Sequence, residues 1–355
     1  MPDKLGTAVV GAAGLGRIHA QAYADDHRCE LLYICDRNPD AARELAERHG
    51  AVPTTSMSEI VADERVAAVS IAAPGHLHLE PALLLITAGK HVLCDCPLAT
   101  RLEDARRISM AAEHGSAALA INFRHRFSPA CLEAKRRMEK LGRPLHGSIT
   151  LAQRRDAAAR LPDAASLGPQ WSLLPHGVDL ARWFAGSEPV SVTSMPASGL
   201  LASRGIDTFD ALHALLDFGG RVVSLEASWT LPEAWPAPAE VAGRFVCEGG
   251  AVAFSLGDQG VVACDQSFSL PAVSDEYDVH GLTAGTARLP VRHFINSVLS
   301  GGAPVANGRD GLVVTMIVEA ILRSAHQKRR VALAELMQPS ERELGVIEEE
   351  EELLD

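Results

Sequence analysis

The architecture follows from residues 71–100, IAAPGHLHLEPALLLITAGKHVLCDCPLAT. The apolar pattern from Leu79 to Ala88 has helical spacing, and the run from His91 to Cys94 is typical of a short buried strand. A further strand-like run, from Ala67 to Ala72, comes just before the helix. A strand, a helix and a second strand in this order predict a parallel βαβ unit.

The same alternation occupies the whole N-terminal third of the chain. Strands are predicted over residues 7–10, 30–35, 67–72, 91–94 and 117–121, and helices over 16–24, 40–49, 79–88 and 102–114. Regular alternation of this kind indicates a doubly wound parallel sheet. We therefore expect an α/β Rossmann domain that spans residues 1–122.

The remainder of the chain has a different pattern. Strand-like runs at 145–152, 190–195, 221–229, 244–248 and 251–255 have no regular helix between them, and helical patterns cover 129–141, 176–184, 290–300 and 311–326. This pattern predicts an α+β domain over residues 123–335, with helices on one face of a large antiparallel sheet. Pro232, Pro236 and Pro238 indicate a loop between strands.

The composition is that of a globular protein. Of its 355 residues 47% are hydrophobic and 22% charged, which suffices for two domains with cores. The N-terminal sequence MPDKLGTAVVG lacks an apolar leader, and no apolar run approaches the roughly 18 residues of a spanning helix. We expect a soluble cytoplasmic protein that does not contact membranes.

The cysteine spacing and the charge distribution limit which metal sites, disulfides and partners are expected. The seven cysteines show no disulfide framework spacing, and the Cys94–Cys96 pair lacks nearby ligands, so we expect reduced thiols and no metal site. Residues 341–355 hold eight acids and one arginine, which leaves −5 of the net charge of −12 for the rest. We expect residues 336–355 to form a mobile acidic tail and nucleic acid not to be a partner. A basic partner for the tail is the alternative.

A glycine-rich loop follows the first predicted strand and opens the first predicted helix. In this setting a loop can place a pyrophosphate on the amides of the helix N-terminus. Ala13 brings a methyl group to a position where the usual motif has glycine. The candidate contacts are Gly11, Ala13, Gly14, Leu15 and Gly16.

Asp36 is a candidate ligand for the adenosine ribose. It ends the second predicted strand, 20 residues past Gly16, where a carboxylate can accept hydrogen bonds from the ribose hydroxyls. A carboxylate repels a 2′-phosphate, which favours NAD, whereas the neighbouring Arg37 could offset that repulsion and admit NADP. A structural turn without a ligand is the alternative.

Three segments resemble the Gfo/Idh/MocA family of oxidoreductases. They are the Pro-x-x-x-His turn at 74–78, the Ala-Gly-Lys-His-Val run at 88–92, and Asp-Cys-Pro at 95–97, where the family has Glu-Lys-Pro. The resemblance implies that Pro74, His78, Asp95 and Pro97 line the nicotinamide end of the cofactor site. It also implies that Cys96 stands at the position of the catalytic lysine. The family's second domain implies a homo-oligomer, a dimer or tetramer, formed through the C-terminal sheet.

A fourth segment, SLGPQWSLLPHGVDLARWFAG at 166–186, resembles the family's His-x-x-Asp-Leu helix. The resemblance implies that His176 transfers the proton and that Ser172 stands where the family has an orienting aspartate. His176 titrates near neutral pH and could act as acid or base. The alternative is a histidine that only packs or caps the helix. Asp179 fits a role in orienting this helix better than a role in the chemistry.

The segment NFRHRFSP at 122–129 matches a part of the family that lines the substrate side. The resemblance implies that Arg124, His125 and Arg126 bind an anionic or polyhydroxyl ligand, and Asp179 is a further candidate for contact with the substrate. Surface charges following a strand are an equal alternative for Arg124, His125 and Arg126.

The first hypothesis is an oxidoreductase that moves a hydride between NAD or NADP and a sugar, polyol or related carbonyl compound. The second, based on Cys96 and Ser172, is a family member that binds the cofactor without catalysis, as a sensor or partner subunit. A hydrolase or lyase that uses NAD transiently is a third, which the missing base counts against.

Overall fold

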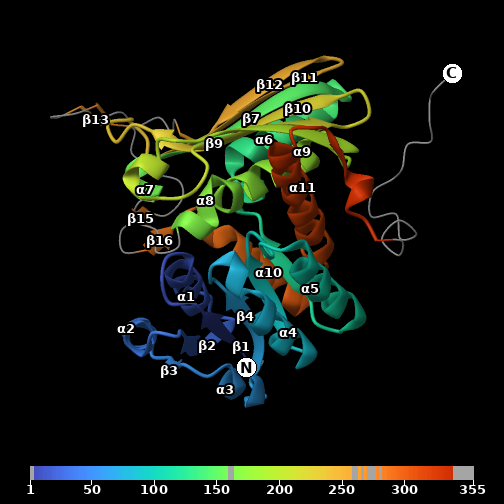
Figure 1. Cartoon of the computed structure of the whole chain (residues 1–355). Helices are drawn as coiled ribbons and strands as arrows, with labels where there is room; N and C mark the ends of the chain where they lie inside the picture. Colours follow the sequence, from blue (N-terminus) through green and yellow to red (C-terminus); the bar gives the residue numbers. More distant parts are fainter. Residues whose placement is uncertain are drawn as a thin grey trace. The chain divides into compact units, whose positions relative to one another are not determined.

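The computed structural model describes residues 4–158, 164–257, 263–264, 268–269, 277–279 and 282–338 (Figure 1). One compact unit contains the described residues of 1–124 and 275–315, and the other those of 125–274 and 316–338. Most of the expected acidic tail, residues 339–355, lies outside the described residues. Within the described ranges, no helix has the length and hydropathy needed to cross a membrane. In the same ranges, no cluster of three or more His, Cys, Asp or Glu side chains is placed to hold a metal ion.

The first unit is built on a sheet of six parallel strands in the order β3-β2-β1-β4-β5-β6. The strands are β1 (Leu5–Val10), β2 (Cys29–Cys35), β3 (Val52–Thr54), β4 (Val66–Ile71), β5 (His91–Asp95) and β6 (Leu119–Asn122). The doubly wound parallel sheet predicted from the sequence is confirmed. Strand β3 was not predicted, because only three residues pair and two of them are exposed.

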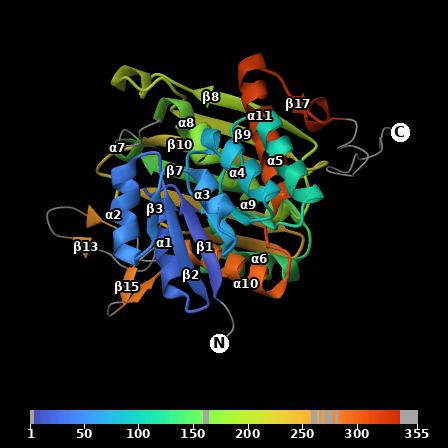
Figure 2. The same ribbon diagram turned by 90° about the horizontal axis from the view of Figure 1, so that it is seen from below.

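Helices connect these strands. They are α1 (Leu15–Asp25), α2 (Pro39–His49), α3 (Met57–Ala62), α4 (Leu79–Thr87) and α5 (Leu102–His114), with the 3₁₀ turn η1 (Gly75–Leu77) before α4. Right-handed crossovers place α1 and α2 on one face of the sheet and α4 and α5 on the other (Figure 2). Local sequence sets the ends of α2: the Asn38 side chain accepts from the amides of Asp40 and Ala41, and Gly50 ends the helix in the left-handed conformation.

Helix α10 (Leu289–Ser300) completes the core of this first unit. Val291, Phe294 and Ile295 are fully buried in the cluster that also contains Tyr23 of α1. The periodicity of the sequence predicts this helix, but the expectation that it covers the sheet of the second domain is wrong. The apolar face of a helix shows that it is buried, not which sheet buries it. The short turn η4 (Thr286–Arg288) leads into α10.

The second unit contains a seven-stranded sheet in the order β12-β11-β7-β10-β9-β8-β17. The strands are β7 (Pro144–Arg154), β8 (Ser191–Ala197), β9 (Ala211–Asp217), β10 (Val222–Leu231), β11 (Ala239–Cys247), β12 (Gly250–Ser255) and β17 (Val331–Ala332). Neighbouring strands are antiparallel, as expected, except that β7 and β10 run parallel. The chain returns to β7 only after residues 155–221, a crossover long enough for a parallel pair. The three prolines lie in the β10–β11 loop, as predicted.

The helices of this unit are α6 (Pro129–Leu141), α7 (Arg155–Ala158), α8 (Ala164–Ser172) and α9 (Leu174–Ala185), with the turn η2 (Arg124–Phe127) before α6. Helix α9 packs on β7 and β10, where an added side chain at Gly177 would meet Leu151. The long helix α11 (Gly308–Gln327) contributes residues to both units. The remaining short elements are η3 (Ala202–Arg204), β13 (Ala263–Cys264), β14 (Phe268–Ser269), β15 (Tyr277–Val279), β16 (Leu282–Ala284) and η5 (Leu333–Glu335).

Candidate functional site

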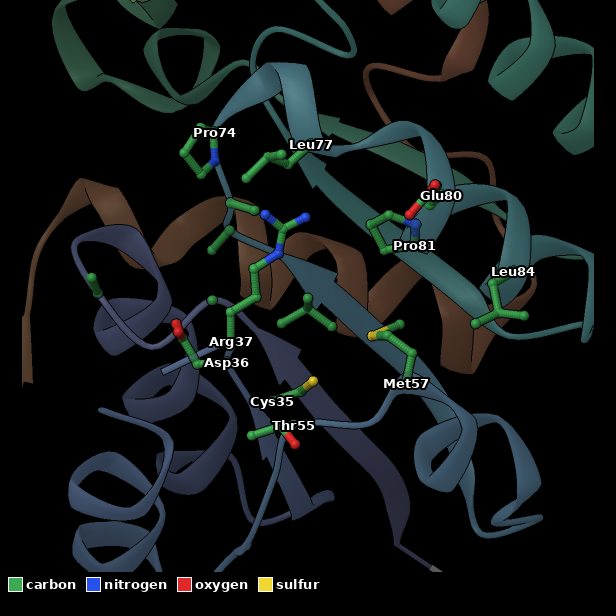
Figure 3. A pocket seen from close by; sticks show the side chains of 15 residues that line it. Cys35, Asp36, Arg37, Thr55, Met57, Pro74, Leu77, Glu80, Pro81 and Leu84 are labelled. Atoms are coloured by element: carbon green, nitrogen blue, oxygen red, sulfur yellow. The ribbon is translucent and has the colours of Figure 1, made fainter. Parts of the chain in front are cut away.

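A cavity of about 420 Å³ opens at the carboxyl ends of β1, β2 and β4 in the first unit (Figure 3). Open parallel sheets bind ligands at this edge, beside the point where the strand order reverses. Here that point lies between β1 and β4. The cavity is lined by Val10, Gly11, Ala13, Cys35, Asp36, Arg37, Thr55, Met57, Ala72, Ala73, Pro74, Leu77, Glu80, Pro81 and Leu84.

Two glycines allow the loop between β1 and α1 to close tightly. A Cβ atom at Gly16 would lie 1.8 Å from the carbonyl oxygen of Gly11. Gly11 has φ +100°, and its own Cβ would lie 2.5 Å from the Ala72 carbonyl oxygen. Both positions therefore exclude any larger residue. Ala13, by contrast, is exposed and presents its methyl group to the cavity.

The N-terminus of α1 faces this loop. Gly14 precedes the helix with φ +50°, and a Cβ there would meet no atom within 4 Å. Among the described residues no side chain caps the helix. Because the first amides of a helix carry partial positive charge, they form a site for phosphate oxygens. The start of α1 is thus left uncapped by the described side chains, next to the methyl group of Ala13.

Asp36 is fixed at the rim of the cavity by two backbone amides. Its Oδ2 accepts from the Ala12 amide at 2.7 Å, and its Oδ1 accepts from the Asn38 amide at 2.8 Å. Each carboxylate oxygen can accept a second bond, so hydroxyl groups of a ligand can still bind. Figure 3 shows the Arg37 side chain extending across the cavity toward Pro74 and Leu77, while the Asp36 side chain points away from that of Arg37.

The opposite wall of the cavity is largely apolar. Pro74 and Leu77 belong to the turn before α4, and Pro81 and Leu84 to α4 itself (Figure 3). Met57 approaches from α3. A slot between apolar side chains and the guanidinium of Arg37 suits a planar base, which can stack on both.

His78 and Pro74, both expected at the nicotinamide end, lie in different surroundings. Pro74 lines the cavity. The His78 ring is fully buried, with Nε2 2.7 Å from the Ala73 carbonyl oxygen and Nδ1 3.0 Å from that of Pro97. Burial lowers the pKa of His78. His78 therefore joins the Pro74 turn to the segment after β5, and it supports the cavity wall from behind.

Asp95, at the end of β5, is also buried. Its Oδ1 accepts from the Asn122 side-chain amide at 2.8 Å, and His19 Nε2 lies 3.7 Å away. Burial lowers the pKa of His19, against the opposing effect of Asp95. Asn122 and His19 were not predicted as site residues. Their spacing in the chain gives no signal, because His19 and Asn122 meet only when the sheet is formed.

The sequence candidates after residue 124 fall in the second unit. Arg126 is paired with Asp179, its Nε donating to both carboxylate oxygens at 3.1 and 2.9 Å, and both side chains are buried. The Ser172 hydroxyl donates to the Gly168 carbonyl oxygen at 2.7 Å. His176 is half-buried on α9. Cys96, half-buried before Pro97, and Arg124, the first residue of η2, belong to the first unit.

Comparison with known proteins agrees with this architecture. Residues 5–123 match the oxidoreductase family with an NAD-binding Rossmann fold, and residues 132–253 match the Gfo/Idh/MocA C-terminal domain. Inositol 2-dehydrogenase of Rhizobium meliloti is 25% identical over 334 residues, which cover 92% of this chain and 98% of that protein. Levoglucosan dehydrogenase of Pseudarthrobacter phenanthrenivorans is 29% identical over 205 residues, 52% of each chain.

Among solved structures, GenD2 from gentamicin A biosynthesis, in complex with NAD, superposes with a TM-score of 0.82 at 25% identity. The match covers 94% of this chain and 97% of GenD2. Three observations point to the same family. They are the family matches on both domains, the full-length relatives, and the glycine loop with Asp36 anchored beside it. The chain belongs to the Gfo/Idh/MocA family of oxidoreductases, and its N-terminal domain is the family's NAD-binding Rossmann domain.

Proposed function

We propose that the protein is an NAD-dependent dehydrogenase of a sugar, a polyol or a related carbonyl compound, with an active site that differs from the family pattern. The observation that carries this proposal is the cavity at the strand ends, where a tightly closed glycine loop and an anchored carboxylate meet an apolar slot. The inositol and levoglucosan dehydrogenases among the relatives support the substrate class.

In this proposal the cofactor is held by the first unit. The amides at the start of α1 bind the pyrophosphate, and Asp36 accepts hydrogen bonds from the ribose hydroxyls. Arg37 and the apolar wall hold the adenine. When bound, NAD accepts the hydride that leaves the carbinol carbon of the substrate. His78 holds the Pro74 turn in place from a buried position, and the buried Asp95 is held by Asn122 at the end of β5.

The protein must then take the hydroxyl proton. We assign that proton to the imidazole of His176: the O–H bond of the carbinol breaks, its electron pair forms the carbonyl, and the proton passes to the ring nitrogen. Cys96 cannot supply the positive charge that the family's lysine brings to the oxygen, since a thiol is neutral or negative. General acid–base groups contribute about 10² to 10⁴-fold, so slower turnover, rather than none, is the expected consequence.

The second candidate is a family member that binds NAD without catalysis. It is favoured by Ser172, whose hydroxyl is engaged with the Gly168 carbonyl oxygen instead of orienting a catalytic group. Both candidates bind NAD, and only the first turns over.

Calorimetric titration with NAD and NADP, followed by a turnover screen with myo-inositol and levoglucosan, separates the candidates. The Cys96→Lys, Ser172→Asp double variant is assayed beside the wild-type protein. NADH formed by the wild-type protein supports the dehydrogenase. NAD binding with turnover only in the double variant supports the non-catalytic candidate, and no affinity for either nucleotide contradicts both.

We also propose that the sheet face of the second unit that exposes Met195 and Leu215 is the interface of a homo-oligomer. Met195 on β8 and Leu215 on β9 are 75% and 51% exposed on neighbouring strands, which is unusual for large apolar side chains. A second copy of the chain would cover them. Light scattering of Met195→Lys should then show a smaller particle than the wild-type protein. Leu132→Lys, an equally apolar exposed site on α6, is the control.

A further inference from the structure

Two histidines from different elements meet in the second unit. His125 lies in η2 and His176 in α9, and their ring centroids are 5.0 Å apart with the planes at 73°, an edge-to-face arrangement. His125 is 8% exposed, whereas His176 is half-buried. Edge-to-face contact between two aromatic rings fixes the orientation of each. His176 thus remains partly exposed while its ring contacts a buried neighbour.

An ion pair beside the two rings joins the same two elements. Arg126 follows His125, and Asp179 lies three residues after His176, on the same side of α9. The Arg126–Asp179 pair therefore ties η2 to α9 beside the histidines. Arg126 is 7% and Asp179 1% exposed, so the connection is not loosened by water. The relative position of the two imidazoles is set by this pair.

The position at which the family has an orienting aspartate does not serve that purpose here. Ser172 lies four residues before His176, but its hydroxyl donates to the Gly168 carbonyl oxygen, in the opposite direction along the chain. A histidine that transfers protons needs a neighbour that fixes its ring and responds to its charge. The ring that contacts His176 belongs to His125.

We propose that His125 is the positioning residue for His176 and takes over the orienting role of the missing aspartate. This inference rests on the proposed function, in which His176 receives the substrate proton. Two positive charges about 5 Å apart repel each other, so protonation of either ring disfavours protonation of the other.

The charged groups near the two histidines come from η2 and α9. Arg124 and Arg126 come from η2, and Asp179 and Arg182 from α9, with Arg126 and Asp179 neutralising each other. Helix α8 contributes the uncharged Ser172. Beneath α9, strands β7 and β10 present Leu151 and Leu225 to Gly177. Groups that interact this closely titrate in two steps that belong to the pair.

Proton NMR titration of the His176 ring tests the proposal without turnover. The resonance is assigned with His176→Asn and followed in the wild-type protein, in His125→Phe, and in the control His146→Phe, an exposed site on β7. Phenylalanine keeps a ring at 125 and removes its charge. We expect the pKa of His176 to rise by at least half a unit in His125→Phe and not in the control. By reciprocity, His176→Phe should raise the pKa of His125 equally.

Turnover gives a second measurement. With NAD and myo-inositol, His125→Phe should lower kcat about 10 to 100-fold, with KM and the calorimetric affinity for NAD changed less than about twofold. His125→Gln, which retains hydrogen-bonding groups, should recover part of kcat, and it also serves if His125→Phe fails to fold. If the titration curve of His176 is the same in the wild-type protein, His125→Phe and His125→Gln, the proposal is overturned. If the two histidines titrate together but the protein shows no turnover, the interaction between His125 and His176 is supported and the proposed dehydrogenase activity is contradicted.

Discussion

Replacement of Arg126 by methionine distinguishes an internal ion pair from a substrate contact. The change removes the guanidinium and leaves the Asp179 carboxylate, 1% exposed, without its main partner. Breaking a buried pair by removing one member costs about 3–5 kcal/mol of the free energy of unfolding. Arg182 Nη1, 4.0 Å from Asp179 Oδ1, compensates part of the remaining charge. We therefore expect a loss at the lower end, about 3 kcal/mol.

Tryptophan fluorescence reports this loss selectively. All four tryptophans lie in the second unit, at positions 171, 183, 229 and 235. For a slope of about 2–3 kcal/mol per M urea, the unfolding midpoint should fall by about 1 M. Arg136→Met is the matched control, because the Arg136–Glu133 pair on α6 is half exposed and should leave the midpoint unchanged.

A compensating variant checks the cause of the loss. In Arg126→Met, Asp179→Leu no charge is left buried, so most of the lost stability should return. An unchanged midpoint in Arg126→Met together with a raised KM for myo-inositol would refute the reasoning. Arg126 would then bind substrate, as the family resemblance implies.

Three further predictions concern the first unit. Gly16→Ala should reduce NAD affinity at least 100-fold by calorimetry, or prevent folding, because the new Cβ would lie 1.8 Å from the Gly11 carbonyl oxygen. In Gly14→Ala the new Cβ would meet no atom within 4 Å, so the cost is the backbone strain at φ +50°, about 1–3 kcal/mol of stability. Asp36→Ser should weaken NAD binding about 10 to 100-fold through loss of charge-assisted hydrogen bonds, with NADP affected less; equal losses for both nucleotides would contradict the ribose contact. Burial lowers the pKa of His19, so its contribution to stability is complete above pH 6.5, the unfolded value, and declines as the pH falls toward the folded value. Between pH 7.5 and 5.5 the free energy of unfolding in urea should therefore fall less in His19→Gln than in the wild-type protein.

The first sheet could be predicted from sequence because its signals are local. Each long strand is an apolar run followed by a helix of clear periodicity, and Gly11 and Gly16 mark a tight turn that needs glycine. The unpredicted strands have weak signals. β3 is three residues long, and β9 exposes His213 and Leu215 between buried residues, so its apolar content is not concentrated.

Side-chain contacts between segments that are far apart in the chain could not be predicted from the sequence. Arg126 and Asp179 are 53 residues apart, and His78 meets Pro97 only through folding of the sheet. Gly11, Ala13, Asp36, Arg37 and Pro74, which the sequence motifs single out, all line one cavity. The motifs could not show that the neighbouring polar groups are already bonded to one another, because hydrogen-bond partners depend on three-dimensional proximity.

The position of α10 has a consequence for biosynthesis. The nucleotide-binding domain needs Phe294 and Ile295 to close its core, yet these residues leave the ribosome after the whole of 125–288. At 5–20 residues per second, that delay is roughly 10–30 s. The emerging domain therefore keeps an apolar face open while most of its successor is being made. A truncated chain ending near residue 124 should for the same reason associate with chaperones or precipitate.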